Sequence, residues 1–281
     1  MEKNFKIIVE YDGTHFDGWQ VQKKGITVQG ELEKALSMIL NQPIKVIGSG
    51  RTDAGVHAIG QVANFHAAID NVKLDIISQT ILKGLNSIIK TPIIIKSCNT
   101  VDPYFHARYN AISKEYHYHI LNSDMPSALG RDYAWHIKQG LDMYKMKMCC
   151  DMLTGEHDFK SFEASGSPRI HTIRKIYSAN MEYLNIKKLK SDSFINTIPQ
   201  IPLLDEDADA YLGVKEHIIF KIVGNGFLRF MVRNIVGTLV MVGLSKITPE
   251  YFREILNSRN RTLAGATAPA RGLFLMRVNY E

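Results

Sequence analysis

The chain has few residues from which a covalent or metal scaffold could be built. Of its 281 residues only three are cysteines, Cys98, Cys149 and Cys150, and two of these are adjacent. They can form neither a disulfide framework nor a paired Cys-x-x-Cys zinc site. His117 and His119 fall on one face of an expected strand, but no His-x-x-Glu-His pattern completes a ligand set around them. We therefore expect no metal.

Long apolar runs are also missing, and we expect no secretory leader. Hydrophobic residues make up 45% and charged residues 22% of the chain, which is ordinary for a globular protein and argues against disorder or a membrane-spanning helix. The first residues, MEKNFKIIVEYDG, pass directly into a strand-like alternation without the three regions of a leader. We expect a cytoplasmic protein with no membrane partner, long enough for two domains.

Charge is distributed unevenly along the chain. The 34 Lys and Arg exceed the 28 Asp and Glu, so the net charge is 34 − 28 = +6. Ser191–Gly213 holds five acidic residues and no Lys or Arg, which leaves 6 + 5 = +11 for the rest. A basic surface of this kind suits a polyanionic partner. Residues 184–213 fit neither a helical nor a strand period, and we expect a surface insertion that points away from such a partner.

The first half of the chain predicts a β-α-β-β-α-β order. The alternating and helical patterns place these elements at Phe5–Tyr11, Thr27–Leu40 with Thr27 as its cap and Pro43 beyond its end, Ile44–Gly48, Gln61–His66, Leu74–Ile88 and Pro92–Cys98.

The second half repeats this order with additions. Strands are expected at Ser113–Ile120, Thr172–Tyr183, Lys215–Val223 and Leu273–Tyr280, and helices at Leu141–Leu153, near Asp158, at Phe227–Val242 and at Pro249–Leu256. The predicted fold is α+β, with two related ferredoxin-like halves, residues 1–108 and 109–281, that share a central antiparallel sheet with helices on one side.

The segment Gly48–His57 holds the most informative chemistry. Its glycines allow a sharp turn around an Arg-x-Asp pair, Arg51 and Asp53. A nearby guanidinium stabilises an ionised carboxylate, and an ionised carboxylate can act as a nucleophile. Asp-Ala-Gly is also good turn sequence, so local chemistry alone favours a structural turn.

The wider motif changes this balance. The stretch from Gly50 to Ala63, GRTDAGVHAIGQVA, resembles the signature of the tRNA pseudouridine synthase A family. Further segments similar to that family are Tyr11–Gln20, Thr27–Glu33, Phe105–Arg108, Lys114–Tyr118, Met231–Gly237 and Arg261–Leu273. The resemblance covers nearly the whole chain except the insertion, and it implies the pseudouridine synthase fold.

Five site residues are implied by this resemblance. It makes Asp53 the catalytic carboxylate, Tyr116 the active-site tyrosine against the target base, and Arg233 the partner that orients Asp53. Leu273 lines the base pocket, and Arg51 beside the aspartate holds the space left by the base or contacts a phosphate.

Two of these residues also have simpler interpretations. Tyr116 could be an ordinary strand aromatic, and Arg233 with Arg229 could form a solvated basic face of an amphipathic helix. The resemblance favours the functional roles.

The resemblance also implies a substrate and an assembly. It indicates an isomerase without a cofactor that acts on tRNA at positions 38, 39 and 40 of the anticodon stem-loop, as a homodimer. Two alternatives stay open, because a fold and a motif do not fix a substrate. One is a non-catalytic RNA-binding protein on the same fold, and the other is a synthase that modifies other tRNA positions or other RNAs.

Overall fold

The computed structural model describes residues 2–69, 74–166, 171–184 and 216–280. The chain forms two units, of which the first is Met1–Lys114 together with Phe274–Glu281 and the second is Glu115–Leu273. The insertion expected at 184–213 lies outside the described residues except for Leu184. The domain boundary expected after residue 108 stays a prediction.

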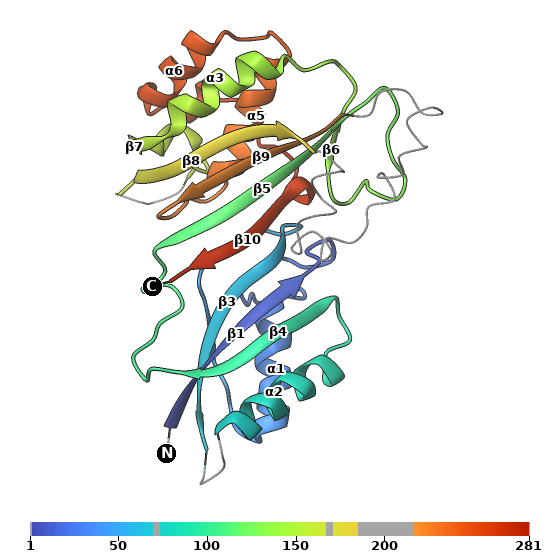
Figure 1. Cartoon of the computed structure of the whole chain (residues 1–281), viewed down its shortest axis with the longest axis vertical. Helices are drawn as coiled ribbons and strands as arrows, with labels where there is room; N and C mark the ends of the chain where they lie inside the picture. Colours follow the sequence, from blue (N-terminus) through green and yellow to red (C-terminus); the bar gives the residue numbers. More distant parts are fainter. Residues whose placement is uncertain (1, 70–73, 167–170, 185–215, 281) are drawn as a thin grey trace. The chain divides into compact units, whose positions relative to one another are not determined.

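The first unit has the predicted β-α-β-β-α-β order. Its elements are β1 (Glu2–Tyr11), α1 (Val28–Leu40), β2 (Val46–Gly48), β3 (His57–Ala68), α2 (Leu74–Ile88) and β4 (Ile93–Val101) (Figure 1). Strand β1 lies between β4 and β3 and is antiparallel to both. The last strand, β10 (Leu273–Asn279), runs parallel to β3, with Phe274 opposite His57.

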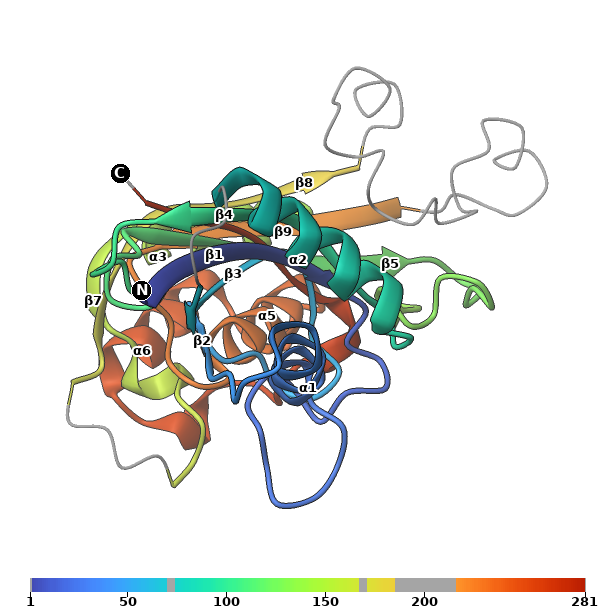
Figure 2. The same ribbon diagram turned by 90° about the horizontal axis from the view of Figure 1, so that it is seen from below.

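The core of the first unit follows from the alternation in β1. Phe5, Ile7 and Val9 are fully buried, because alternate side chains of a strand point to the same face. Phe5 stacks on Phe65 of β3 with the ring centroids 5.3 Å apart. Helices α1 and α2 pack against each other, and α2 packs along β4 (Figure 2).

The ends of α1 show how the sequence sets its length. Thr27 is the N-cap, as predicted, and its side chain accepts a hydrogen bond of 3.3 Å from Gly30 N. The helix ends at Asn41, which has φ 50. A left-handed residue of this kind stops the helical hydrogen bonds, so the helix ends before Pro43 is reached.

The second unit is also mixed. Its elements are β5 (Ser113–Asn122), β6 (Trp135–Ile137), α3 (Met143–Leu153), β7 (Gly155–Asp158), β8 (Ile173–Tyr183), β9 (Glu216–Gly224), α5 (Met231–Gly243) and α6 (Pro249–Ser258). The strand order is β5-β9-β8-β7, and β6 pairs with β5 in parallel. Helices α3, α5 and α6 pack on one another beside β8 and β9 (Figure 1).

The two strands that flank the expected insertion pair with each other. Tyr183 of β8 lies opposite Ile218 of β9 in an antiparallel ladder. Leu184 N donates a hydrogen bond of 2.7 Å to His217 O just beyond that pair. The described ends of this long connection therefore meet as in a hairpin.

The second unit differs from the sequence-based expectation at the start of one helix and in two short strands. Helix α5 begins at Met231 rather than Phe227, because Phe230 has φ 63 and interrupts helical geometry before it. The helical segment expected near Asp158 is the short 3₁₀ helix Phe159–Phe162, which Asp158 caps at the end of β7. Strands β6 and β7 were not expected, since three and four residues are too few for a readable alternation.

The α+β class predicted from the sequence is confirmed, with mostly antiparallel strand pairs. In the described part of the chain, no helix is long and apolar enough to cross a bilayer.

Candidate active site

Asp53 lies in the middle of the loop Ser49–Val56, which joins β2 to β3 in the first unit. Its side chain is half-buried, while Arg51 is exposed. Val56 N donates to Asp53 O at 3.2 Å, and Gly55 has φ 76. Asp53 thus opens a turn, as its sequence predicts. A turn of this kind also holds the backbone of Asp53 at a fixed point of the loop, so the structural and the functional interpretations are compatible.

The N-terminal motif is docked against this loop through its backbone. Trp19 N donates to Thr52 O at 3.1 Å, and Gly55 N donates to Phe16 O at 3.3 Å. Gly18, between them in the chain, has φ 91, and a Cβ there would lie 2.7 Å from Thr52 O. Only glycine combines this backbone conformation with so close an approach. The glycine of the Gly18-Trp19 pair is therefore a requirement of the loop.

Buried side chains hold the loop at Thr52. Tyr11 OH and Thr52 Oγ1 form a buried hydrogen bond of 2.8 Å. Burial raises the pKa of Tyr11 well above its ordinary value, although the hydrogen bonds to Thr52 and Gln61 oppose this shift. The phenol therefore keeps its proton at neutral pH, and the bond to Thr52 persists.

A second set of contacts fixes the start of the loop. Ser49 Oγ donates to Gln61 Oε1 at 2.7 Å, and Gln61 Nε2 donates to Gly50 O at 3.1 Å. Lys114 Nζ donates to Ser49 O at 2.6 Å. A Cβ at Gly50 would lie 2.9 Å from Lys114 Nζ. The loop is held at its first residues by side chains from two different strands, β3 and β5.

Lys114 carries its positive charge in a partly buried position, which is unfavourable for an ammonium group. Burial, and to a smaller extent the positive charge of Arg108, lower its pKa to about 8. At neutral pH the ammonium is still mostly protonated, so a positive charge lies against the backbone of the loop that carries Asp53. Lys114, the first residue of the sequence motif Lys114–Tyr118, therefore helps to hold the Asp53 loop of the first unit.

Tyr116 belongs to β5 in the second unit. It is 8% exposed, and its ring meets the ring of Phe227 edge-on at 5.1 Å and 80°. Phe227 lies in the turn that follows β9. Edge-to-face packing fixes the plane of the tyrosine ring, which a residue that stacks on a base requires.

Arg233 lies in the first turn of α5 and is tethered on two sides. Its Nε donates to Ala268 O at 2.8 Å, and its guanidinium lies 4.9 Å from the centroid of the Phe230 ring. Arg229 contacts the same ring at 4.8 Å but is exposed, whereas Arg233 is half-buried. A solvated basic face therefore describes Arg229 and not Arg233.

The segment that leads to Leu273 is packed tightly in the second unit. A Cβ at Gly237 of α5 would lie 1.8 Å from Ala266 O. Tyr118 OH donates to Pro269 O at 2.8 Å, and a Cβ at Gly272 would meet the Tyr118 ring at 2.7 Å. Leu273 follows at the start of β10 and is 5% exposed.

The structure divides the expected residues between the two units. Arg51 and Asp53 share one loop of the first unit, and Arg233 is bonded to the segment of the second unit that ends at Leu273. Tyr116 is held in the second unit by Phe227. That these groups form one site, with Arg233 orienting Asp53, stays a proposal.

The two histidines considered for a metal have other contacts. His117 Nε2 lies 2.7 Å from Glu115 Oε1, and His119 Nδ1 lies 3.0 Å from His217 Nε2 in a buried pair. Among the described residues there is no group of three or more His, Cys, Asp or Glu side chains placed to hold a metal ion.

Sequence reasoning assigned no role to several residues that fix the Asp53 loop. Tyr11, Lys114 and Gln61 all lie in quoted motifs, yet their contacts with the loop are long-range. One sequence feature could have identified such residues: a polar residue at a strand position that is expected to be buried, as Gln61 is.

Comparison with known proteins gives one consistent result. A family model described as tRNA pseudouridine synthase matches residues 7–110 and 149–281. Proteins named tRNA pseudouridine synthase A from Thermoanaerobacter sp. (strain X514) and Acetivibrio thermocellus are 40% and 39% identical over 278 residues, which is 99% of this chain and 100% of each relative. The protein of that name from Thermosipho melanesiensis is 39% identical over 276 residues, or 98% of this chain and 99% of the relative.

Proposed function

The chain belongs to the tRNA pseudouridine synthase family and is an isomerase, and from this premise we propose that it converts uridines 38, 39 and 40 of the tRNA anticodon stem-loop to pseudouridine. The observation that carries the proposal is the Ser49–Val56 loop. Hydrogen bonds fix its backbone on both sides of Asp53, and Arg51 stands two residues away. Family membership supports the reaction and the tRNA substrate, while the positions are our proposal.

The reaction is an internal rearrangement that needs no oxidant and no energy source. The C1′–N1 bond of uridine breaks, the uracil rotates, and a new bond joins C5 to C1′. The proton lost from C5 is balanced by the proton gained at N1, so product and substrate have the same composition.

In the proposed mechanism Asp53 acts as an ionised carboxylate. It either bonds covalently to the substrate or removes a sugar proton, and both routes start from the charged form. Arg233 orients this carboxylate, and its tether to Ala268 O keeps the guanidinium in one place. Tyr116 stacks on the uracil, and its hydroxyl takes part in removal of the C5 proton. Leu273 lines the base pocket.

Access to C1′ in a stem requires the nucleotide to be extruded. Unstacking and unpairing cost a few kcal/mol, which contacts between basic side chains and phosphates offset. The chain outside Ser191–Gly213 carries 6 + 5 = +11, so it is suited to bind a polyanion.

The decisive experiment replaces the carboxylate. Asp53→Asn keeps the size of the side chain and removes its charge, so we expect loss of pseudouridine formation on a tRNA transcript with nearly unchanged tRNA affinity. The melting temperature provides the control for folding. Turnover close to that of the wild type would contradict the assignment and favour a non-catalytic RNA-binding protein.

Tyr116 is tested by removing only its hydroxyl. Tyr116→Phe should preserve stacking on the base and packing on Phe227, so substrate binding should persist while product formation slows. A normal product yield would show that the hydroxyl is dispensable.

The target positions require a separate measurement. Pseudouridine should be mapped in total tRNA from cells with and without this protein. Loss of the modification at positions 38, 39 and 40 supports the proposal, and loss only at other positions favours the alternative substrate.

We also propose that the enzyme works in the cytoplasm as a homodimer, as the family resemblance implies. Closed two-fold pairing is the commonest oligomeric arrangement. Sedimentation at micromolar concentration should show a dimer, and a fully active monomer would contradict this part of the proposal.

A further inference from the structure

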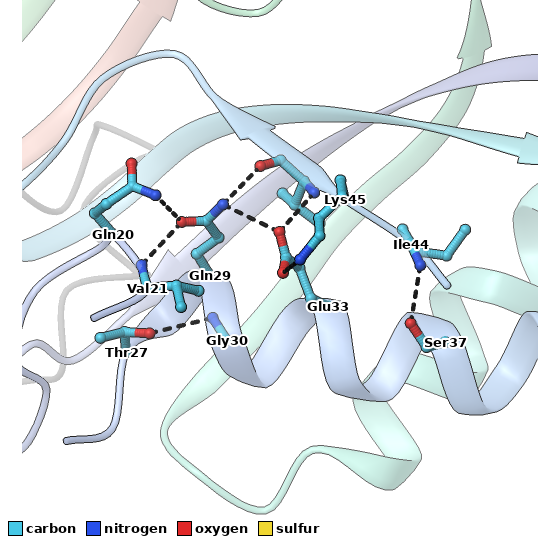
Figure 3. Close-up of polar contacts among 10 residues, drawn as sticks. Gln20, Val21, Thr27, Gln29, Gly30, Glu33, Ser37, Ile44 and Lys45 are labelled. Atoms are coloured by element: carbon cyan, nitrogen blue, oxygen red, sulfur yellow. Dashed lines mark hydrogen bonds and ion pairs between the residues drawn. The ribbon is translucent and has the colours of Figure 1, made fainter. Parts of the chain in front are cut away.

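A buried glutamine of α1 has every polar atom of its amide engaged. Gln29 is 9% exposed. Its Oε1 accepts from Gln20 Nε2 at 2.6 Å and from Val21 N at 2.9 Å. Its Nε2 donates to Glu33 Oε1 at 3.1 Å and to Val46 O at 3.0 Å (Figure 3). Rotating the amide by half a turn would set donors against donors and acceptors against acceptors, so only one orientation is possible.

The carboxylate of Glu33 anchors the far end of this arrangement. Its Oε1 also accepts from Val46 N at 3.0 Å, and its Oε2 pairs with Lys45 Nζ at 3.2 Å. The Glu33 side chain is 12% exposed. The donor side of Gln29 is thus fixed by a partly buried, ionisable acceptor.

The orientation of Gln29 determines the orientation of Gln20. Because Gln29 presents an oxygen, Gln20 must direct its Nε2 toward Gln29, as Figure 3 shows. Its own Oε1 is then the atom available to a donor on its other side. That donor is Arg51 Nε, at 3.0 Å.

We infer that Gln20 is a positioning residue that fixes the guanidinium of Arg51, two residues before Asp53 in the loop, and that Gln29 sets the direction of its hydrogen bond. The inference rests on the proposed function, in which Arg51 contacts the space of the displaced base or a phosphate.

Arg51 needs a positioning residue because its side chain is long and flexible. Arg51 is exposed, and a free arginine side chain samples many rotamers that are lost on binding. Its guanidinium carries five N–H donors, of which the bond to Gln20 uses the one on Nε. A hydrogen bond at Nε sets the plane of the guanidinium and leaves the edge with the two Nη groups for RNA. Arranging the group before substrate arrives lowers the cost of binding and orientation.

The rival interpretation is that Gln20 and Gln29 only seal α1 against the neighbouring loop. In that case removing Gln20 would lower stability, and its effect on activity would not depend on Arg51. The two interpretations differ in coupling, which a double-mutant cycle measures.

The experiment compares Gln20→Ala, Arg51→Ala and the double variant. For each, kcat and KM are measured on a tRNA transcript, together with the melting temperature. We expect Gln20→Ala to lower kcat/KM by roughly tenfold, the order of effect that a lost positioning contact produces, and to have almost no further effect when Arg51 is already alanine. Equal losses in both backgrounds, or no loss in the first, would overturn the inference.

A matched control lies two residues away in the same segment. Gln22 is exposed, and its Nε2 donates to Asp17 O at 2.7 Å. Gln22→Ala removes a glutamine hydrogen bond from this segment without touching the Gln29 contacts. It should leave kcat/KM within about twofold of the wild type, as expected for surface substitutions.

A second readout does not depend on the reaction. In nitrogen-15 NMR spectra, the Arg51 Nε–H proton should exchange slowly with water in the wild type and quickly in Gln20→Ala. Gln29→Met should also speed its exchange, because it frees the Gln20 amide to rotate. If the wild type makes no pseudouridine, the proposed function fails while this contact can still be confirmed. If exchange does not change, the positioning contact itself is refuted.

Discussion

Two parts of the molecule are fixed by different sets of contacts: the loop that carries Asp53, and the segment 264–272, to which Arg233 donates a hydrogen bond. Besides its backbone contacts with Phe16, Gly18 and Trp19, the loop Ser49–Val56 is held by hydrogen bonds from side chains of distant elements, among them Tyr11, Gln61 and Lys114. The segment 264–272 also accepts side-chain hydrogen bonds, at Ala268 O and Pro269 O, but in addition it presses the backbone of Ala266 against Gly237 of a helix. Polar contacts can be removed one at a time with graded effects, whereas a backbone contact tolerates no added atom. We therefore expect substitutions at the loop to change rates and those at the segment to change folding.

The largest expected effect comes from one methyl group at Gly237. In an exposed helix interior, Gly→Ala stabilises by up to about 1 kcal/mol. Here the new Cβ would lie 1.8 Å from Ala266 O, so the backbone must move. We expect Gly237→Ala to lower the free energy of unfolding by about 3 kcal/mol, the range for overpacked sites, as measured by urea denaturation.

A second helical glycine provides the control for this prediction. A Cβ at Gly84 of α2 would lie 3.0 Å from Ile39 Cδ1, the flexible end of a side chain that can move. Gly84→Ala should change the free energy of unfolding by less than about 1 kcal/mol. Similar losses at both positions would refute the contrast between close backbone packing and ordinary packing.

The next effect is a pH dependence of stability that belongs to the second unit. Burial lowers the pKa of His217 to about 4, below the value of about 6.5 for an exposed histidine. Between these values the unfolded state binds more protons, so stability is complete above about pH 6.5 and is lost as pH falls toward 4. At about 1.4 kcal/mol per pH unit, this loss approaches 3 kcal/mol.

The measurement compares the wild type with His217→Gln, which cannot be protonated. The free energy of unfolding should fall between pH 7 and pH 4.5 in both proteins, but less steeply in the variant. The variant is less stable at pH 7, since it disturbs the contact with His119. Parallel curves would show that His217 is not the group that titrates.

A moderate effect on rate is expected from Lys114. Lys114→Met keeps the apolar stem and removes the bond to Ser49 O, so the loop loses one of its anchors. We expect kcat to fall about tenfold, as for other losses of orientation. The melting temperature should stay the same or rise, because burial of the ammonium is unfavourable, as its lowered pKa shows. Loss of stability with unchanged kcat would reverse this expectation.

The sequence predicted the elements better than the contacts between them. The range of α2 and the cap Thr27 follow from local patterns, and both are confirmed. The late start of α5 could not be predicted, because phenylalanine rarely adopts a left-handed backbone and the sequence does not indicate that Phe230 has φ 63. Local periodicity carries information about one element at a time, and it gives no signal for a single left-handed residue at the start of a helix.

The same limit applies to the candidate site. The turn at Asp53 is encoded by adjacent residues, so its geometry was readable. The anchors are not adjacent: Arg51 and Gln20 are separated by 31 positions, and Lys114 and Ser49 by 65. Only the folded chain brings such pairs together, and a motif shows that a residue belongs to a family without showing what it contacts.

The smallest expected effect removes one hydroxyl from the loop. Tyr11→Phe deletes the buried bond between Tyr11 OH and Thr52 Oγ1, which should cost about 1 kcal/mol of stability. Since Thr52 precedes Asp53, kcat should also fall a few-fold. Tyr118→Phe is the matched control, because it removes one hydroxyl from a bond of the same length, 2.8 Å, to Pro269 O in the second unit. Its cost in stability should be similar, but its kcat should stay nearer that of the wild type. If both variants lose rate equally, hydrogen bonds at the loop have no special part in catalysis, and the contrast between a polar-fastened loop and a packed segment describes folding alone.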